Sequence, residues 1–470
     1  MIRTVAAKEF RALARDPRVR LTAVILVLML LVSLLSAISR FADVSQERAA
    51  AQALINEQWA NQGEKNPHAA AHYGIYAIRP VTPLSFFDTG ITSFAGVSIW
   101  LEAHRRNLPG ARPADDNTAA GPNAELTAAY TLQVLLPLFI ILLSFQAFAG
   151  EREQGTLRQL LGTGVAPFTL LAGKAIGIAA AAAVVVAPVI VVGLIGLCFA
   201  PGGLAELPAA IAIGVAYGVY ALIFLFLSLA VSARLATSQA ALVALLAFWA
   251  VSSFVLPRIS ADLAAWRYPL PSAVELESRI NAEIESGLDG RNPAEIIDER
   301  RRTMLAMYKA DSVDDLPINF QGIIFALREE LDAAVFAKHF GDVYTRLEAQ
   351  QSMYGTASLL SPRMAIELTS MNFAGSGLTQ QIDFANHAEQ YRMKFIETLN
   401  QDLTINSKPG QTDYRSGPEL WQRIGDYQYP GLSLARVVQT TLPLLLVLAI
   451  WLAATVGAAW LAMRRLRITV

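Results

Sequence analysis

Long apolar segments alternate with two long polar segments along this chain. Six of the apolar segments are long enough for a helix to cross a membrane, which takes about 20 residues. These six cover residues 21–39, 126–148, 170–199, 207–231, 240–256 and 437–463. The polar segments cover residues 41–124 and 258–431. This alternation predicts an all-α polytopic membrane protein with six transmembrane helices.

The N-terminal residues 1–18 read MIRTVAAKEFRALARDPR and precede the first apolar segment. Helical spacing gathers their apolar side chains roughly on one face and leaves most basic side chains elsewhere. We therefore predict an amphipathic helix on the membrane surface, ended at Asp16–Pro17, with a solvated leader as the alternative. A cleaved signal peptide is disfavoured, because its apolar part usually has about 7–15 residues. Segment 21–39 is longer than that.

A polar stretch, 150–168, interrupts the apolar sequence between the second and third spans. It consists of a charge cluster, a glycine–threonine break and a short amphipathic helix with leucines on one face. The residues singled out here are Glu151, Arg152, Glu153, Gly155, Thr156 and Leu157. Arg158 and Gln159 fall on another face of the helix. A short polar helix between two spans is suited to being pushed by a partner.

The two polar segments differ in how their proline, glycine and apolar residues are distributed. Proline and glycine recur from Pro67 to Pro122, so we expect loops with short helices there. Segment 258–431 instead shows apolar stripes at helical spacing. The stripes are Ile324, Leu327, Leu331 and Val335, and then Leu378, Ile382, Ala385, Ala388, Tyr391, Phe395 and Leu399. We expect Pro257 to close the fifth span.

Basic residues near the ends of the spans predict the orientation in the membrane. With the N-terminus inside, the cytoplasmic side holds Arg3, Lys8, Arg11, Arg15, Arg18, Arg20, Arg152, Arg158, Lys174, Arg234, Arg464, Arg465 and Arg467. The external turn 201–206 has no lysine or arginine. We therefore expect cytoplasmic N and C termini, a basic tail at 464–470, and a mainly α-helical extracytoplasmic domain built from two insertions, 41–124 and 258–431. The expected location is the bacterial inner (cytoplasmic) membrane, in multi-pass form.

The amino-acid composition supports the interpretation as a membrane protein and argues against few other classes of protein. Residues are 54% hydrophobic and 16% charged, against about 25% charged in soluble domains. The formal net charge is -1, and no basic patch interleaved with aromatic residues is present, so no nucleic-acid partner is expected. The single cysteine, Cys198, lies in an apolar segment and says nothing about redox compartment.

The motifs that carry chemistry are few. No G-x-x-x-x-G-K-[ST] phosphate-binding loop occurs, so the chain does not hydrolyse ATP itself. The spans have almost no internal charge, which disfavours an ion-coupled carrier. No Ser/His/Asp or Cys/His constellation is present, so the chain is predicted not to be an enzyme.

Three of the five histidines, His68, His72 and His104, fall in the first polar segment. His68 and His72 are four residues apart, which puts both imidazoles on one helical face, and Glu102 is close to His104 in the sequence. Such a group can bind zinc or copper. The interpretation favoured by the sequence is that these histidines serve the fold and that no metal is bound.

The stretch after the second span resembles the ABC transporter permeases of the type 2 (ABC-2) class. The matching pattern is two glutamates, then Gly-Thr-Leu, then Gly-Lys opening the next span, in residues Glu151, Glu153, Gly155, Thr156, Leu157, Gly173 and Lys174. Four external sequences resemble a subfamily with a large extracytoplasmic domain of unknown function. They are NPHAAAHYGIYAIRPVTPLSFFDTGI (66–91), WLEAH (100–104), LLSPRMAIELTSMNFAGSGL (359–378) and FANHAEQYRMKFIETLN (384–400). The resemblance covers essentially the whole chain.

This resemblance implies the membrane subunit of an ATP-driven transporter. It also implies an exporter, because this class of permeases is mostly associated with export. Residues 150–168 would be a coupling helix that docks on a separate ABC ATP-binding subunit, and residues 1–18 an elbow helix. That partner would use ATP and Mg²⁺, whereas this chain would bind no cofactor. A second permease copy, in a homodimer or heterodimer, is implied, and an extracytoplasmic partner protein is possible. The alternative is a membrane-anchored scaffold or sensor that binds a ligand outside and has no ATPase coupling.

Overall fold

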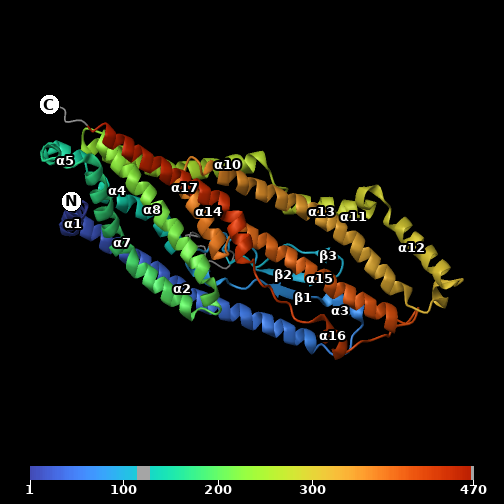
Figure 1. Cartoon of the computed structure of the whole chain (residues 1–470). Helices are drawn as coiled ribbons and strands as arrows, with labels where there is room; N and C mark the ends of the chain where they lie inside the picture. Colours follow the sequence, from blue (N-terminus) through green and yellow to red (C-terminus); the bar gives the residue numbers. More distant parts are fainter. Residues whose placement is uncertain (114–126, 467–470) are drawn as a thin grey trace.

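The computed structural model describes residues 1–113 and 127–466 as an elongated, mostly helical body (Figure 1). The N-terminal helix and the last turn of the C-terminal helix lie at the same end of a helical bundle, which we call the terminal end. The opposite end carries a group of helices and strands from residues 43–113, 268–345 and 378–430, which we call the distal domain.

Six helical segments in the described residues are long and apolar enough to cross a membrane. They are α2 (Pro17–Ala60), α4 with α5 (Ala128–Glu153), α7 (Pro167–Phe199), the segment Gly203–Arg234 with α8 (Leu207–Arg234), the segment Ser238–Arg267, and α17 (Leu434–Arg464). The prediction of an all-α polytopic membrane protein with six spans is confirmed. Part of the first polar segment, at 114–124, and residues 467–470 of the predicted tail lie outside the described residues.

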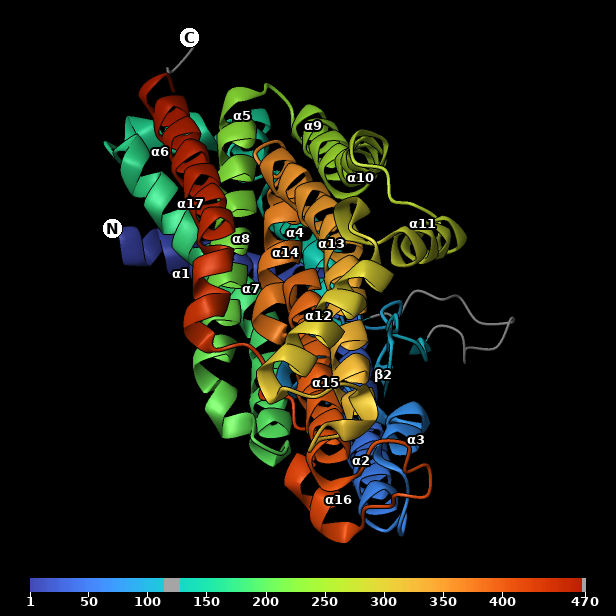
Figure 2. The same ribbon diagram turned by 90° about the vertical axis from the view of Figure 1, so that its right-hand side faces the viewer.

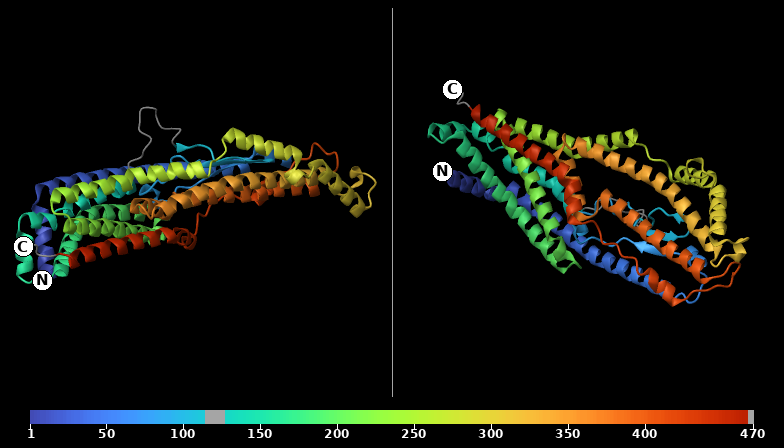
Figure 3. Two further views of the ribbon diagram at one scale, coloured as in Figure 1. Left: turned by 90° about the horizontal axis from the view of Figure 1, so that it is seen from above. Right: turned by 45° about the vertical axis from the view of Figure 1, so that its right-hand side comes forward.

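Helix α1 (Ile2–Arg15) lies across the terminal end and packs against α7 (Figure 3). Close approach is possible because the facing residue of α7 is Gly173, where a Cβ would stand 2.5 Å from Cβ of Val5. Asp16 has extended backbone angles and caps α2 by accepting the Arg18 N–H, and Pro17 occupies the first turn of α2. The predicted break at Asp16–Pro17 is therefore confirmed.

Pro257 does not close the fifth span, and that prediction is wrong. Helix α9 (Ser238–Ala250) passes through a π-helical turn (Val251–Val255) into α10 (Leu256–Arg267) without interruption. A proline removes one backbone donor and crowds the carbonyl one turn earlier. The wider π turn directly before Pro257 relieves that crowding, and the helix continues to Arg267.

The first polar segment contains a small sheet, so the expectation of only loops and short helices there is wrong. Strand β1 (Ile75–Ile78) pairs antiparallel with β2 (Ser98–Glu102), and β2 pairs antiparallel with β3 (Arg105–Arg106), giving the order β1-β2-β3. Helix α3 (Pro67–Tyr73) precedes the sheet. The strands are two to five residues long, which is too short for a period-two pattern to stand out in the sequence.

The distal domain is a helical layer packed on this sheet and on the outer half of α2. Its other helices are α11 (Ala273–Ser286), α12 (Pro293–Tyr308), α13 (Phe320–Ala357), α15 (Leu378–Asn406) and α16 (Pro418–Ile424). Edge-to-face contacts of Trp59 with Phe395 and with Trp421 lie in its core. The apolar stripes predicted for 324–335 and 378–399 fall on α13 and α15, which pack against each other.

One helix of the second polar segment is buried inside the bundle. Helix α14 (Pro362–Ala374) packs against α17, α8 and α4 (Figure 2). The turn that leads into it is held by Trp451 Nε1, which donates to the Ser358 carbonyl at 3.2 Å near the middle of α17. Ser361 Oγ donates to the Ser252 carbonyl at 2.8 Å. The chain thus enters the bundle along α13 and leaves it along α14.

Candidate functional site

The loop between the second and third spans forms two short helices at the terminal end. Helix α5 (Ala149–Glu153) is followed by α6 (Thr156–Gly162). Gly155 joins them with a φ of 74°, a left-handed conformation that glycine adopts without steric cost. Thr156 Oγ1 donates to the Glu151 carbonyl at 3.2 Å and fixes the corner.

Glu151 is the centre of an ion-pair cluster that joins three helices. Its Oε1 accepts from Lys8 Nζ of α1 at 3.1 Å and from Lys174 Nζ of α7 at 3.0 Å. Lys174 Nζ also contacts Glu9 Oε2 of α1 at 3.2 Å. Lys174 is 2% exposed, so its charge is compensated within the cluster rather than by water. We call Lys8, Glu9, Glu151 and Lys174 the terminal cluster.

Arg152 attaches the same loop to the end of α8. Its guanidinium donates to the carbonyls of Ala233, at 2.7 Å, and of Leu235. These carbonyls have no partner inside the helix, and the C-terminal end of a helix dipole favours a cation. The arrangement holds α5 against the last turn of α8.

Glu153 attaches the loop to the start of α9. Its carboxylate accepts from Ser238 N at 3.0 Å and from Ser238 Oγ at 2.6 Å. The positive end of the helix dipole favours a carboxylate at this place. Glu151, Arg152 and Glu153 therefore connect one five-residue helix to α1, α7, α8 and α9.

The outward surface of the loop is formed by other residues. Leu157 is buried at 5% exposure, and its side chain packs in the core of the bundle. Arg158 and Gln159 are exposed, together with Gln154 and Gly155. The residues singled out from the sequence thus mostly hold the loop in place, and the surface free for a partner is the Arg158–Gln159 face of α6. The sequence did not indicate Lys8, Glu9 and Ser238, because nothing in the local sequence indicates contacts across 80 residues or more.

The three histidines of the first polar segment converge in the distal domain. His68 and His72 lie on α3, and His104 lies on the two-residue turn between β2 and β3. His68 Nε2 and His72 Nε2 are 3.2 Å apart, and one ligand atom from each of the three residues lies within 4.8 Å of the others. Burial, followed by the charges of His72 and His104, lowers the pKa of His68 to about 4, so its ring is neutral at physiological pH.

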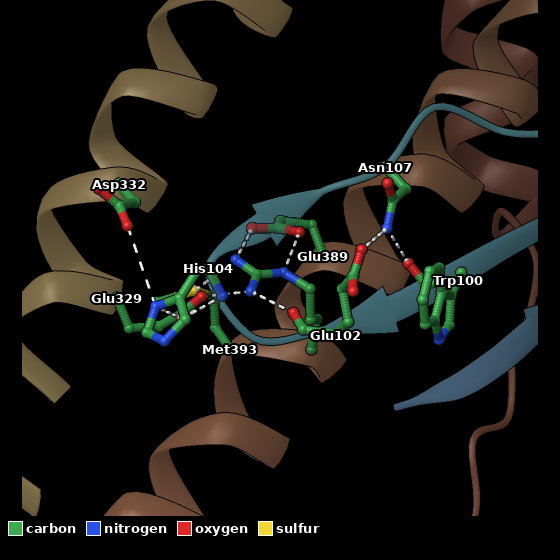
Figure 4. Close-up of polar contacts among 9 residues, drawn as sticks. Trp100, Glu102, His104, Asn107, Glu329, Asp332, Glu389 and Met393 are labelled. Carbon is green, nitrogen blue, oxygen red and sulfur yellow. Dashed lines mark hydrogen bonds and ion pairs between the residues drawn. The ribbon is translucent and has the colours of Figure 1, made fainter. Parts of the chain in front are cut away.

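Carboxylates on α13 face the third histidine (Figure 4). Glu329 Oε2 accepts from the His104 backbone N–H at 2.7 Å and lies 3.4 Å from His104 Nδ1. Asp332 Oδ2 is 4.0 Å from Nδ1. Burial and the neighbouring Glu329 charge raise the pKa of Asp332 to about 6. Glu329 is 3% exposed, and Arg392 forms an ion pair with it.

An apolar cavity of about 940 Å³ lies beside α2, where the bundle meets the distal domain. Its lining runs along α2 from Leu28 to Ile55 and continues onto Ile78 of β1. Arg40 and Glu47 of α2 contribute charged groups to this mostly apolar wall.

These features define a multi-pass helical membrane protein whose loop between the second and third spans is tied to a surface helix and to three spans. A family model of the ABC-2 family transporter proteins matches residues 3–461, and the chain belongs to this family. No curated protein matches the chain. As a member of the family, the chain is a permease of an ABC transporter, a transport subunit rather than a catalytic one, and the family implies an ABC ATP-binding partner.

Proposed function

We propose that this chain converts closure of separate ATP-binding subunits into movement of the spans, in the direction of export. The terminal cluster carries this proposal. A force on α5 reaches α1 and α7 through Lys8 and Lys174, and reaches α8 and α9 through Arg152 and Glu153. Charge-assisted hydrogen bonds transmit such a displacement well because they are short and strong.

The terminal end faces the cytoplasm in this proposal, and the distal domain faces outward. The basic residues near the span ends support this orientation, since Arg158 lies on α6 and Arg234 and Arg464 are the last residues of α8 and α17. The ATP-binding subunits would then meet α6 through Arg158 and Gln159. They would supply the ATP and Mg²⁺ chemistry, for which this chain has no phosphate-binding loop. The bacterial inner membrane is the proposed location.

Two permease subunits are proposed for each transporter, as a homodimer or as a heterodimer with a similar permease. Two ATP-binding subunits close on each other, so their motion needs a receiving surface on each side. The cavity beside α2 supports a cargo with an apolar portion, because its wall is mainly apolar and crosses from the bundle to the distal domain. An extracytoplasmic partner would receive the cargo from the distal domain.

A charge reversal on the exposed face of α6 tests the proposal. We expect Arg158→Glu to reduce co-purification of the ATP-binding subunit and the ATPase activity of the complex. The matched control is Arg300→Glu, which changes another exposed arginine, on α12 of the distal domain. If Arg158→Glu and Arg300→Glu complexes assemble and hydrolyse ATP like the wild type, α6 does not couple. The result would then favour a membrane-anchored scaffold or sensor.

Glu151 and Glu153 are less informative targets for this purpose. Their carboxylates are used inside the chain, by Lys8 and Lys174 and by Ser238. A change there alters the loop itself, whereas Arg158 changes only the surface offered to a partner.

A further inference from the structure

The geometry of the three histidines points to a metal site in the distal domain. Two imidazole nitrogens that share one tetrahedral ion at 2.0–2.1 Å lie about 3.3 Å apart. The Nε2 atoms of His68 and His72 are 3.2 Å apart, and the ligand atom of His104 lies within 4.8 Å. We propose that His68, His72 and His104 bind one late first-row divalent ion, Zn²⁺ or Cu²⁺, the ions that imidazole ligands favour.

Helix α3 presents its two histidines in a fixed arrangement. Asn66 caps the helix by accepting the N–H groups of His68 and Ala69, and Pro67 occupies its first turn. The His68 ring stacks on Phe325 of α13 with centroids 3.5 Å apart. Its Nδ1 is buried and has no hydrogen-bond partner among residues 1–113 and 127–466. Its Nε2 faces Nε2 of His72, so Nε2 is the His68 nitrogen that is placed to bind an ion.

The turn that carries His104 is held against α3. The Ala103 N–H donates to the Ala71 carbonyl at 3.0 Å. His104 itself has a φ of 60°, a left-handed conformation that is uncommon outside glycine and concentrates at functional sites. Its backbone bond to Glu329 maintains this conformation and brings the imidazole beside His72.

Glu329 supplies the second layer that metal-bound histidines require. Its Oε2 lies 3.4 Å from His104 Nδ1, which leaves Nε2 of His104 for the metal. Arg392, in turn, fixes Glu329 from the other side and also donates to the Glu102 carbonyl at 3.0 Å. Figure 4 shows Glu329 and Asp332 on the same side of the His104 ring, where their negative charge favours a nearby cation.

The proposed site is open to solvent on one side. His72 is exposed, whereas His68 and His104 are half-buried. Three histidines leave the fourth position of a tetrahedral ion for water, unlike closed structural zinc sites with four protein ligands. The ion should therefore exchange with the surrounding medium, and binding should tie α3 more firmly to the β2–β3 turn and, through His104 and Glu329, to α13.

Metal titration of the purified full chain tests this site without any transport assay. We would strip the protein with a chelator and titrate Zn²⁺ against a chromophoric competitor. Parallel samples would take up Cu²⁺ for counting coordinated nitrogens by electron paramagnetic resonance. The expected result is one ion per chain with three nitrogen ligands. His72→Ala, which removes an exposed side chain, should weaken binding by more than about 100-fold, beyond the 10–100-fold typical of outer-shell changes.

His339→Gln is the matched control, because His339 lies on another part of α13 and pairs with Glu283 of α11. It should bind metal like the wild type. The proposal is overturned if the wild-type chain shows no saturable binding, or if His72→Ala and His339→Gln bind equally well. Circular dichroism of each variant separates lost ligands from lost folding. Failure of this test leaves the coupling proposal untouched, since α6 and the terminal cluster take no part in it.

Discussion

Two clusters of charged side chains, one at the terminal end and one in the distal domain, are built around different buried cations. The terminal cluster uses lysines: Lys174 reaches Glu9 and Glu151, and Glu151 also accepts from Lys8. The distal cluster uses Arg392, whose guanidinium pairs with Glu329 and Glu389. Arg392 is 1% exposed and Lys174 is 2% exposed, so burial does not distinguish them.

The geometry of the two cations does distinguish them. A guanidinium is a planar fork that fixes its carboxylates in one arrangement, whereas an ammonium is a point charge on a flexible stem that can move between acceptors. The distal cluster holds two elements, α13 and α15, in one fixed relation. The terminal cluster joins three helices that the proposed mechanism requires to shift. In the proposed mechanism, ion pairs thus provide rigidity in the distal domain and an adjustable contact at the terminal end.

Replacing Arg392 is expected to have the largest effect on the stability of the chain. Arg392→Met leaves Glu329, 3% exposed, without its cation. Breaking a buried pair by removing one partner costs about 3–5 kcal/mol. We expect this loss in thermal unfolding and in limited proteolysis of the distal domain. Arg300→Met, at an exposed position of α12, should change stability little.

A paired substitution decides whether charge is the cause. Arg392→Met with Glu329→Gln removes the two most buried charges and keeps an acceptor for the His104 N–H, while Glu389 remains at 15% exposure. This double variant should recover much of the lost stability. If the double variant is as unstable as Arg392→Met alone, the arginine acts through its packing and hydrogen bonds, and the comparison of the two clusters fails at this end.

Asp88 extends the comparison to a buried carboxylate that forms no ion pair with the described lysines and arginines. It is 6% exposed, and its Oδ1 accepts from Gly90 N at 3.0 Å. Burial raises the pKa of the Asp88 carboxyl to about 6. Protonation therefore stabilises the folded chain: the benefit is complete below about pH 4 and is lost as the pH rises through about 6.

Asp88→Asn removes this pH dependence. A rise of about 2 pKa units corresponds to about 3 kcal/mol, so Asp88→Asn should be more stable than the wild type by up to that amount at pH 8. The difference should shrink towards pH 5. Thermal unfolding between pH 5 and 8, with Asp311→Asn as the exposed control, measures it. A difference that stays constant with pH would show that Asp88 is charged in the folded chain.

The sequence allowed the spans to be predicted because their signal is local. A continuous apolar run such as 170–199 needs no knowledge of its neighbours, and the stripes of α13 and α15 repeat within one helix. Strand β1 could not be predicted in this way, since its partner β2 follows 20 residues later and each strand is short. The prediction that the fifth span ends at Pro257 was wrong because the π turn that accommodates this proline has no clear sequence signal.

The sequence also could not predict that α14 is buried, or which residues contact the loop between the second and third spans. Helix α14 looks polar, yet Asn372 Nδ2 donates to Thr441 Oγ1 at 3.3 Å and Arg363 Nη1 donates to the Ser253 carbonyl at 3.1 Å. These two polar side chains of α14 are therefore paired with groups on the spans. Similarly, Lys8 and Glu151 are 143 residues apart, so only the fold shows that they meet.

The smallest expected effect concerns the terminal cluster and separates its two lysines. Lys174→Met removes the buried cation, but Lys8 remains beside Glu151, so we expect a loss of about 2 kcal/mol, less than for a fully unpaired charge. Lys8→Met should cost below about 1 kcal/mol, because the Lys8 side chain is 62% exposed.

Thermal unfolding measures the stability of both variants, and the ATPase activity of the complex measures coupling. If the lysines transmit the force from the ATP-binding subunits, Lys174→Met should lower the ATPase activity of the complex by more than its loss of stability explains. Lys8→Met should lower this activity less. Equal activity in wild type and both variants would mean that the terminal cluster only holds α1 in place, and that the difference between lysine and arginine clusters has no mechanical meaning.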